Sequence, residues 1–279
     1  MSSLLLAAAV LLLAAGGEAD AGVRTLSLDK DRALTVELPC TANALVRASI
    51  APDLQPVIAL LRDPDGELLA EVRNPMQLDE PLPVAAIPAR SGTCTLALSL
   101  ESGQPGKIQL RVDATRPATA LDRTQIEGER THQRALLLWS EGSEASMKEA
   151  VQLEARAAAL AHEAGDLRGE ANAHACGGGV LWQLGEFEAA NRELTTAIEL
   201  RTWLGDPRAL AEAYNDRSVV LTVTHVSAAL EDLNRARALA EPLGNPDLLA
   251  EILHNIAFVH WAGKEYERAL EVFRESERV

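Results

Sequence analysis

The sequence predicts a multi-domain chain, in which an N-terminal all-β sandwich precedes an all-α solenoid of helix pairs. Two observations carry this prediction. Apolar residues alternate with period two through residues 22–115, as they do in half-buried strands. Residues 126–279 are instead rich in Ala, Leu, Glu and Arg, and small residues recur there at intervals of 40, 39 and 40. A signal peptide at 1–21 and a linker at 116–125 are expected to complete the chain.

The first 21 residues have features of a bacterial secretory signal. Leu4 to Ala15 form an apolar run that is too short to span a bilayer. The run is followed by Ala19-Asp20-Ala21, which supplies the small residues that signal peptidase requires. We expect cleavage after Ala21 and a periplasmic or secreted protein, with no membrane span after cleavage.

Residues 22–115 predict a small antiparallel sandwich of six or seven short strands. Asp63-Pro64-Asp65-Gly66 lies between two strand-like runs and predicts a hairpin, because Pro presets φ and Gly tolerates positive φ. Cys40 and Cys94 fall in this region, and an oxidising compartment would let them form a disulfide. The alternative is that both, like Cys176, are small buried apolar residues.

One stretch of this region is similar to a known family. Pro56-Val57-Ile58-Ala59-Leu60 leads into the Asp63–Gly66 turn, and Ser91-Gly92-Thr93 opens a later strand. This pattern resembles the bacterial pre-peptidase C-terminal β-sandwich, which implies an accessory module beside a secreted enzyme. The aspartates Asp53, Asp63 and Asp65 are expected to be solvated turn residues rather than Ca²⁺ ligands. A carbohydrate-binding role is weakly supported, since no Trp precedes residue 139.

The repeat is the strongest signal in the sequence. Its register is set by a small residue in each unit, namely Ala150, Ala190, Ala229 and Ala269. A Gly lies fifteen residues after each of the first three, and Asp or Asn follows that Gly. Gly ends a helix in the αL conformation, and Asp or Asn caps the next helix. Each unit is therefore expected to be an antiparallel helix pair that stacks on its neighbours.

This period resembles the tetratricopeptide repeat (TPR) in a long variant. Leu184-Gly185-Glu186-Phe187-Glu188-Ala189-Ala190 and Gly263-Lys264-Glu265-Tyr266 carry the resemblance, whereas the turn before Val226 lacks its Gly and is one residue short. The family binds proteins or peptides in a concave groove lined by the first helix of each pair. Here those helices would bring Asn172, Tyr214, Asn215, His254, Asn255 and Phe258 to the groove. Packing between helices is the favoured role for Trp182 and Trp261.

Together the two halves suggest an exported scaffold or adapter that binds a protein or peptide. The arrangement also resembles the N-terminal half of secreted bacterial proteins that end in a caspase-like CHAT peptidase. The alternative function is therefore a non-catalytic portion of such a peptidase. The last helix pair has no expected cap after Val279. This predicts either a truncated form of a longer protein or self-association through the C-terminal helix.

The composition excludes several other functions. A net charge of −15 argues against a nucleic acid partner, which would need clustered Lys and Arg, and it favours a basic partner. No phosphate-binding loop and no metal-ligand spacing occurs, so we expect no metal, no cofactor and no enzyme activity. Cys176-Gly177 with His132 superficially matches a cysteine-protease pattern. A helix position for Cys176 is the preferred interpretation, because such a nucleophile follows a parallel strand.

Overall fold

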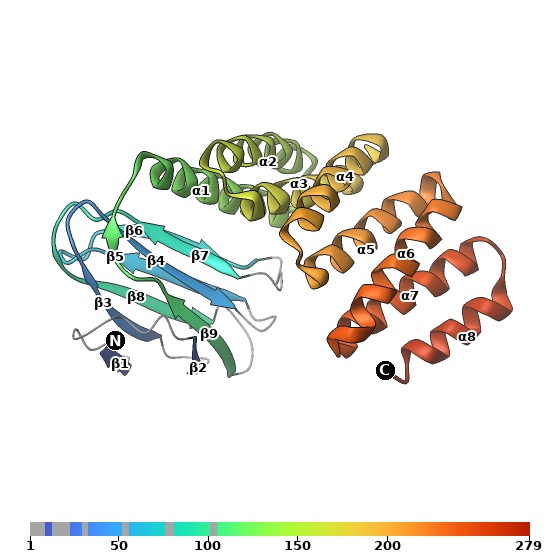
Figure 1. Ribbon diagram of the computed structural model, residues 1–279, viewed down its shortest axis with the longest axis horizontal. Coiled ribbons are helices and arrows are strands. Elements are labelled where there is room, and N and C mark those ends of the chain that lie inside the picture. The colour runs from blue at the N-terminus through green and yellow to red at the C-terminus, as the bar shows by residue number, and fades with distance from the viewer. Residues whose placement is uncertain (1–8, 13–22, 30–32, 52–55, 76–80, 101–104) are drawn as a thin grey trace, which may run out of the picture. The chain divides into compact units, whose positions relative to one another are not determined.

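The computed structural model describes residues 9–12, 23–29, 33–51, 56–75, 81–100 and 105–279. The chain divides into two compact units, residues 1–140 and 141–279 (Figure 1). Most of the predicted signal peptide, with its cleavage site, lies outside the described residues, as does Asp53. Within the described residues, no helix is long and apolar enough to cross a membrane.

The first unit contains two β-sheets that share one apolar core. One sheet has the order β1 (Ala9–Leu12), β3 (Leu34–Cys40), β8 (Gly92–Leu100), β5 (Val57–Arg62) and β6 (Leu68–Arg73). The other has the order β10 (Arg116–Pro117), β4 (Ala44–Ala51), β9 (Gly106–Val112) and β2 (Arg24–Leu28), with β7 (Leu82–Ala86) also paired to β4. All pairs are antiparallel except β1 with β3. Alternate residues of both sheets face the core, as the period of two requires.

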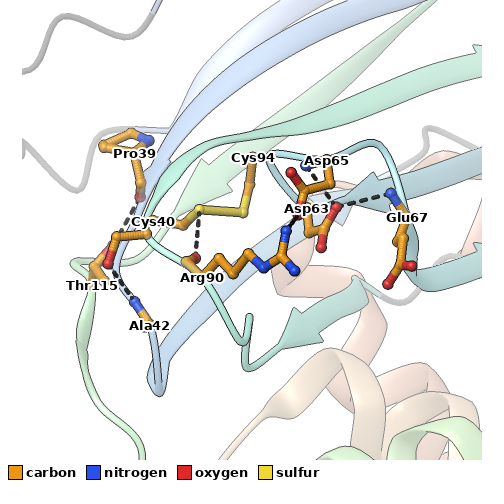
Figure 2. The surroundings of a disulfide bond; sticks show 10 residues. Pro39, Cys40, Ala42, Asp63, Asp65, Glu67, Arg90, Cys94 and Thr115 are labelled. Atoms are coloured by element: carbon orange, nitrogen blue, oxygen red, sulfur yellow. Dashed lines mark hydrogen bonds and ion pairs between the residues drawn. A yellow bond between two sulfur atoms is a disulfide. The ribbon is translucent and has the colours of Figure 1, made fainter.

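The predicted hairpin between β5 and β6 is confirmed. Asp63 organises its turn, because its carboxylate accepts hydrogen bonds from the backbone N–H groups of Asp65 (2.9 Å) and Glu67 (2.8 Å). Asp65 in turn forms an ion pair with Arg90 (Figure 2). Asp63 is buried, so it is a structural turn residue and not a solvated one.

A disulfide joins Cys40 and Cys94 at one end of β3 and β8, with their Cα atoms 5.9 Å apart (Figure 2). Both cysteines are buried in the core between the sheets. The strands pair directly, with Leu38 opposite Cys94 and Cys40 opposite Gly92. The bridge therefore fixes the register of two neighbouring strands that are 54 residues apart in sequence.

The predicted fold class is wrong in one respect, because the first unit is not all-β. It also contains most of helix α1 (Ala120–Glu141). Ile126 of α1 packs with Leu45 of β4 and Ala85 of β7. Glu129 pairs with Arg47 at 2.6 Å, and Arg130 donates to the carbonyl of Leu69. The amphipathic face of α1 is buried on a sheet, so the chain is a β-region with an attached helix followed by a TPR-like helical part.

A compact hydrogen-bond network fixes the start of α1. Thr119 and Asp122 bond reciprocally, with Thr119 N donating to Asp122 Oδ2 at 2.7 Å and Asp122 N donating to Thr119 Oγ1 at 3.2 Å. Arg116 adds two hydrogen bonds to the Asp122 carboxylate, at 2.8 and 2.6 Å. Since Arg116 lies in β10, the network ties the last strand of the sheet to the helix.

The second unit is a TPR-like array of antiparallel helices. Its elements are α2 (Glu144–Ala164), α3 (Leu167–Gln183), α4 (Phe187–Leu204), α5 (Pro207–Thr224), α6 (Val226–Ala240), the short η1 (Glu241–Leu243), α7 (Pro246–Ala262) and α8 (Tyr266–Ser276). Helix α2 packs on α3, and the pairs α3–α4, α5–α6 and α7–α8 follow (Figure 1). The four register alanines are all buried at helix–helix contacts, as expected.

The predicted helix ends are also confirmed. Gly165, Gly205 and Gly244 have φ of 72°, 64° and 63°, the left-handed conformation that ends a helix without a Cβ clash. The residues that follow, Asp166, Asp206 and Asn245, cap the next helices. Each side-chain oxygen accepts a hydrogen bond from a backbone N–H three residues later, at 3.0 to 3.2 Å. These caps define the start of each first helix.

Candidate functional site

The three first helices, α3, α5 and α7, lie beside one another in the second unit. Twelve residues after each cap stands a small buried residue, Gly178, Ser218 or Ala257, and Gly178 lies against Leu194 of the partner helix α4. Residues six, nine, ten, thirteen and sixteen after each cap form a different stripe. We call the three stripes together the first-helix face. It comprises Asn172, Ala175, Cys176, Gly179 and Trp182 on α3, Glu212, Asn215, Asp216, Val219 and Thr222 on α5, and Glu251, His254, Asn255, Phe258 and Trp261 on α7.

An amide relay connects α5 to α7 on this face. Asn215 Nδ2 donates to Glu251 Oε1 at 2.9 Å, and Asn255 Nδ2 donates to Asn215 Oδ1 at 2.9 Å. Asn215 is only 3% exposed, whereas Asn255 is half-buried. The structure thus brings two predicted groove residues together, but it gives them different surroundings. Asn215 holds Glu251 and Asn255 in place, and Asn255 is the amide that a ligand could reach.

Large aromatic side chains continue this face along α7. Phe258 and Trp261 stack with ring centroids 5.7 Å apart and an interplanar angle of 27°. They are 46% and 54% exposed. The expectation that Trp261 packs between helices is therefore wrong. His254, also exposed, makes an edge contact with Phe273 of α8 at 5.1 Å.

The remaining predicted residues are less central. Asn172 lies on the face at the position of Glu251 in α7, outside the amide relay. Tyr214 does not lie on the stripe. It packs against the core of the array, with the guanidinium carbons of Arg217 and Arg235 at 5.8 and 5.6 Å from its ring centre. Tyr214 therefore has a packing role that leaves little of it available to a ligand.

Asn215 and Asn255 are 40 residues apart, which matches the repeat period and predicts that they stack as equivalent residues, but a register shift makes this prediction wrong. The turn between α5 and α6 is one residue shorter than the others, so counting back from Ala229 overshoots by one. Counted from the caps, Asn215 matches His254, and Asp216 matches Asn255. Asn215 and Asn255 are therefore diagonal neighbours that bond to each other, rather than equivalent residues that stack.

Sequence reasoning missed a buried ion pair behind the face. Arg217 of α5 binds Asp232 of α6 through two hydrogen bonds, at 2.7 and 2.8 Å, and also donates to Thr195 of α4 at 3.1 Å. Asp232 is 2% exposed. The available signal was Arg217 itself, a charge at a position where the repeat normally packs tightly. The bidentate pair joins three helices and holds the middle of the array.

A second polar contact fixes the turn after α7. Glu265, the residue before α8, binds His260 at 2.8 Å and Arg268 at 3.1 Å. The hydrogen bond from His260, followed by that from Arg268, holds the pKa of Glu265 below its usual range. This contact links the last turn of α7, which holds His260, to the first turn of α8, which holds Arg268.

Cys176 lies in the interior of helix α3 and is partly exposed. Among the described residues, the element before α3 is the helix α2 and not a strand. The neighbouring Gly178 is accounted for by packing, because a Cβ there would meet Leu194 Cγ at 2.6 Å. The position of Cys176 supports the helical interpretation of the Cys-Gly sequence over a catalytic one.

Comparison with known proteins adds distant structural likenesses. No protein-family model and no curated protein matches the chain. BtubC (BKLC) from P. vanneervenii is similar over 57% of this chain and 68% of its own, with 22% identity and a TM-score of 0.49. The apo form of RapI matches 57% of this chain and 56% of its own, at 14% identity and a TM-score of 0.49. A Rap protein complexed with competence and sporulation factor matches 58% and 43%, at 12% identity and a TM-score of 0.48. The chain thus spans about half of each Rap structure, and the resemblances to the pre-peptidase sandwich and to CHAT proteins are not confirmed.

Proposed function

We propose that the helical array is a scaffold that binds a peptide, or a segment of another protein, on the first-helix face. The exposed Phe258–Trp261 pair is the observation that carries this proposal. Two large aromatic side chains about half exposed and stacked on each other are typical of binding surfaces, where they supply rigid apolar area. They lie within two helical turns of Asn255, whose amide can bond a ligand.

The chemistry of the face suits a peptide main chain. Asn255 keeps its Oδ1 and one N–H for a ligand, and a peptide group offers the matching donor and acceptor. The buried Asn215 positions this amide through the relay. Binding therefore loses less side-chain entropy, because Asn255 is ordered before a ligand arrives. Ligand side chains would then contact Phe258 and Trp261. The proposed role is binding and involves no catalytic step.

Selection from a display library of random twelve-residue peptides on the full chain tests this proposal. The comparison variant is Phe258→Ala with Trp261→Ala, since both side chains are exposed and their removal spares the core. The matched control is Trp203→Ala on α4, which is 86% exposed and lies off the face. Selected peptides should bind the control as they bind the unchanged chain, and lose binding to the double variant. Peptides that bind all three proteins equally would contradict the proposal.

We further propose that the scaffold is exported, with cleavage after Ala21. The supporting observation is the Cys40–Cys94 disulfide, since such bridges persist in oxidising compartments. N-terminal sequencing of the native protein is the direct test. A mature chain beginning at Gly22 is the expected result, and a retained Met1 would contradict it.

A further inference from the structure

The first-helix face carries acidic residues but no Lys or Arg. Among its fifteen positions stand Glu212, Asp216 and Glu251, and none is Lys or Arg. Glu212 is paired with Arg208 at 3.0 Å, whereas the exposed Glu251 accepts its hydrogen bond from the neutral amide of Asn215. The whole second unit has 24 Asp and Glu against 13 Lys and Arg, a formal charge of −11. The electrostatic field of this negative charge attracts cationic ligands.

The amide relay has a fixed direction, and Glu251 sets it. A carboxylate only accepts hydrogen bonds, so Asn215 must point its Nδ2 at Glu251. Its Oδ1 then faces Asn255, which must donate through Nδ2. Asn255 Oδ1 is left pointing away from Asn215, and no described residue donates to it. The face therefore presents acceptors to a ligand, at Asn255 and at Glu251.

The aromatic pair supplies the third element. A cation is attracted to the faces of Phe and Trp rings, and more strongly where water is partly excluded. Glu251, Asn255, Phe258 and Trp261 follow one another along one stripe of α7. The stripe covers ~15 Å at 1.5 Å per residue. An extended peptide of four or five residues spans the same length.

We propose that the ligand of this face is a peptide segment carrying arginine or lysine side chains. One cationic side chain lies on the Phe258–Trp261 pair, and donors of the segment bind Asn255 Oδ1 and Glu251. This inference rests on the proposed peptide-binding function of the same face. It adds the charge of the ligand, which that function leaves open.

Fluorescence anisotropy with three dye-labelled nine-residue peptides tests the inference on the full chain at physiological salt. The peptides alternate Ala with Arg, with Asn or with Glu. The Arg peptide should bind most tightly. Its affinity should fall ~10-fold with Phe258→Ala and Trp261→Ala together, as the loss of a cation–π contact of 1–2 kcal/mol predicts. Glu251→Gln should weaken it several-fold.

Matched controls separate a site from diffuse attraction to an acidic protein. Glu163→Gln on α2 and Glu231→Gln on α6 remove exposed charges off the face and should leave affinity within about twofold. Equal weakening by Glu163→Gln and Glu251→Gln would overturn the inference, as would tighter binding of the Asn or Glu peptide. If the Asn or Glu peptide binds and is lost in the aromatic variant, peptide binding on this face stands and only the ligand charge is wrong. If no peptide binds, the inference fails, and the library selection decides the proposed function separately.

Discussion

Asn255 donates its side-chain amide to Asn215 across 2.9 Å, from one first helix of the repeat array to the next. The contact links an exposed binding surface to the interior, because Asn215 is buried and also holds Glu251. Two neighbouring helix pairs are thereby fixed in register, and the amide that faces a ligand is oriented before the ligand arrives.

Substitution of Asn215 should therefore affect stability as well as binding. Asn215→Ala leaves Glu251 and Asn255 without their partner, at a cost of about 1–3 kcal/mol. Asn215→Asp should be worse, because it places a second carboxylate against Glu251. Asn172→Ala, on the same face but outside the relay, is the control. Urea denaturation followed by circular dichroism measures the free energy of unfolding of each variant. An Asn215→Asp variant as stable as the unchanged chain would show that the relay is unimportant.

Two adjacent glycines of α3 should respond in opposite ways to alanine. A Cβ at Gly177 would meet only Glu154 Cβ at 3.6 Å, an ordinary contact, so Gly177→Ala should stabilise by up to ~1 kcal/mol through helix propensity. A Cβ at Gly178 would meet buried Leu194 at 2.6 Å, so Gly178→Ala should destabilise by about 1–3 kcal/mol. Thermal melts of the two variants check this, and shifts of the same sign would contradict the packing of α3 on α4.

The Arg217–Asp232 pair predicts a strong asymmetry between single and double variants. Asp232→Leu alone strands a largely buried guanidinium and should cost about 3–5 kcal/mol. Arg217→Met with Asp232→Leu removes both charges and should recover most of that loss. Chemical denaturation of the singles and the double supplies the cycle. Additive losses would mean that the two charges do not interact.

Asp122 should make the first unit sensitive to acid. The hydrogen bonds from Arg116, aided by Thr119, hold the pKa of Asp122 well below its usual range despite burial. The unfolded-state pKa is ~3.9, so the carboxylate stabilises the fold above about pH 4, and this contribution is lost as the pH falls further. Asp122→Asn should cost about 1–2 kcal/mol at pH 7 and progressively less below pH 4. Asp29→Asn, at an exposed position, is the control. A loss independent of pH would refute the assignment.

Local signals in the sequence predicted the repeat array well. Gly165 and Asp166 determine a helix end and a helix start by backbone chemistry alone, and Ala190 marks a close helix contact by its size. Local signals could not show what helix α1 packs against, because its apolar stripe can pack on a sheet or on another helix. Its placement depends on long-range contacts such as that of Ile126 with Leu45.

The candidate site was predictable only in part, for a similar reason. Repeat spacing pointed to Asn215 and Asn255, but one missing residue in the turn before Val226 shifted their alignment. That shift decides which amide is buried. The exposure of Trp261 could not be predicted from the sequence either, since a Trp at helical spacing packs between helices as readily as it binds a ligand.

Photo-crosslinking tests the central claim most directly, namely that the first-helix face binds peptides. Benzoylphenylalanine is placed at position 258 on the face, or at position 203 on α4, and each protein is irradiated with a peptide obtained from the display selection. Both positions are aromatic sites on the surface, and Trp203 is the more exposed of the two (86% against 46%), so a peptide that diffuses freely would reach position 203 at least as readily. A crosslink at position 258 and none at position 203 is the predicted result. Equal crosslinking at the two positions, or crosslinking at 203 alone, would contradict the account.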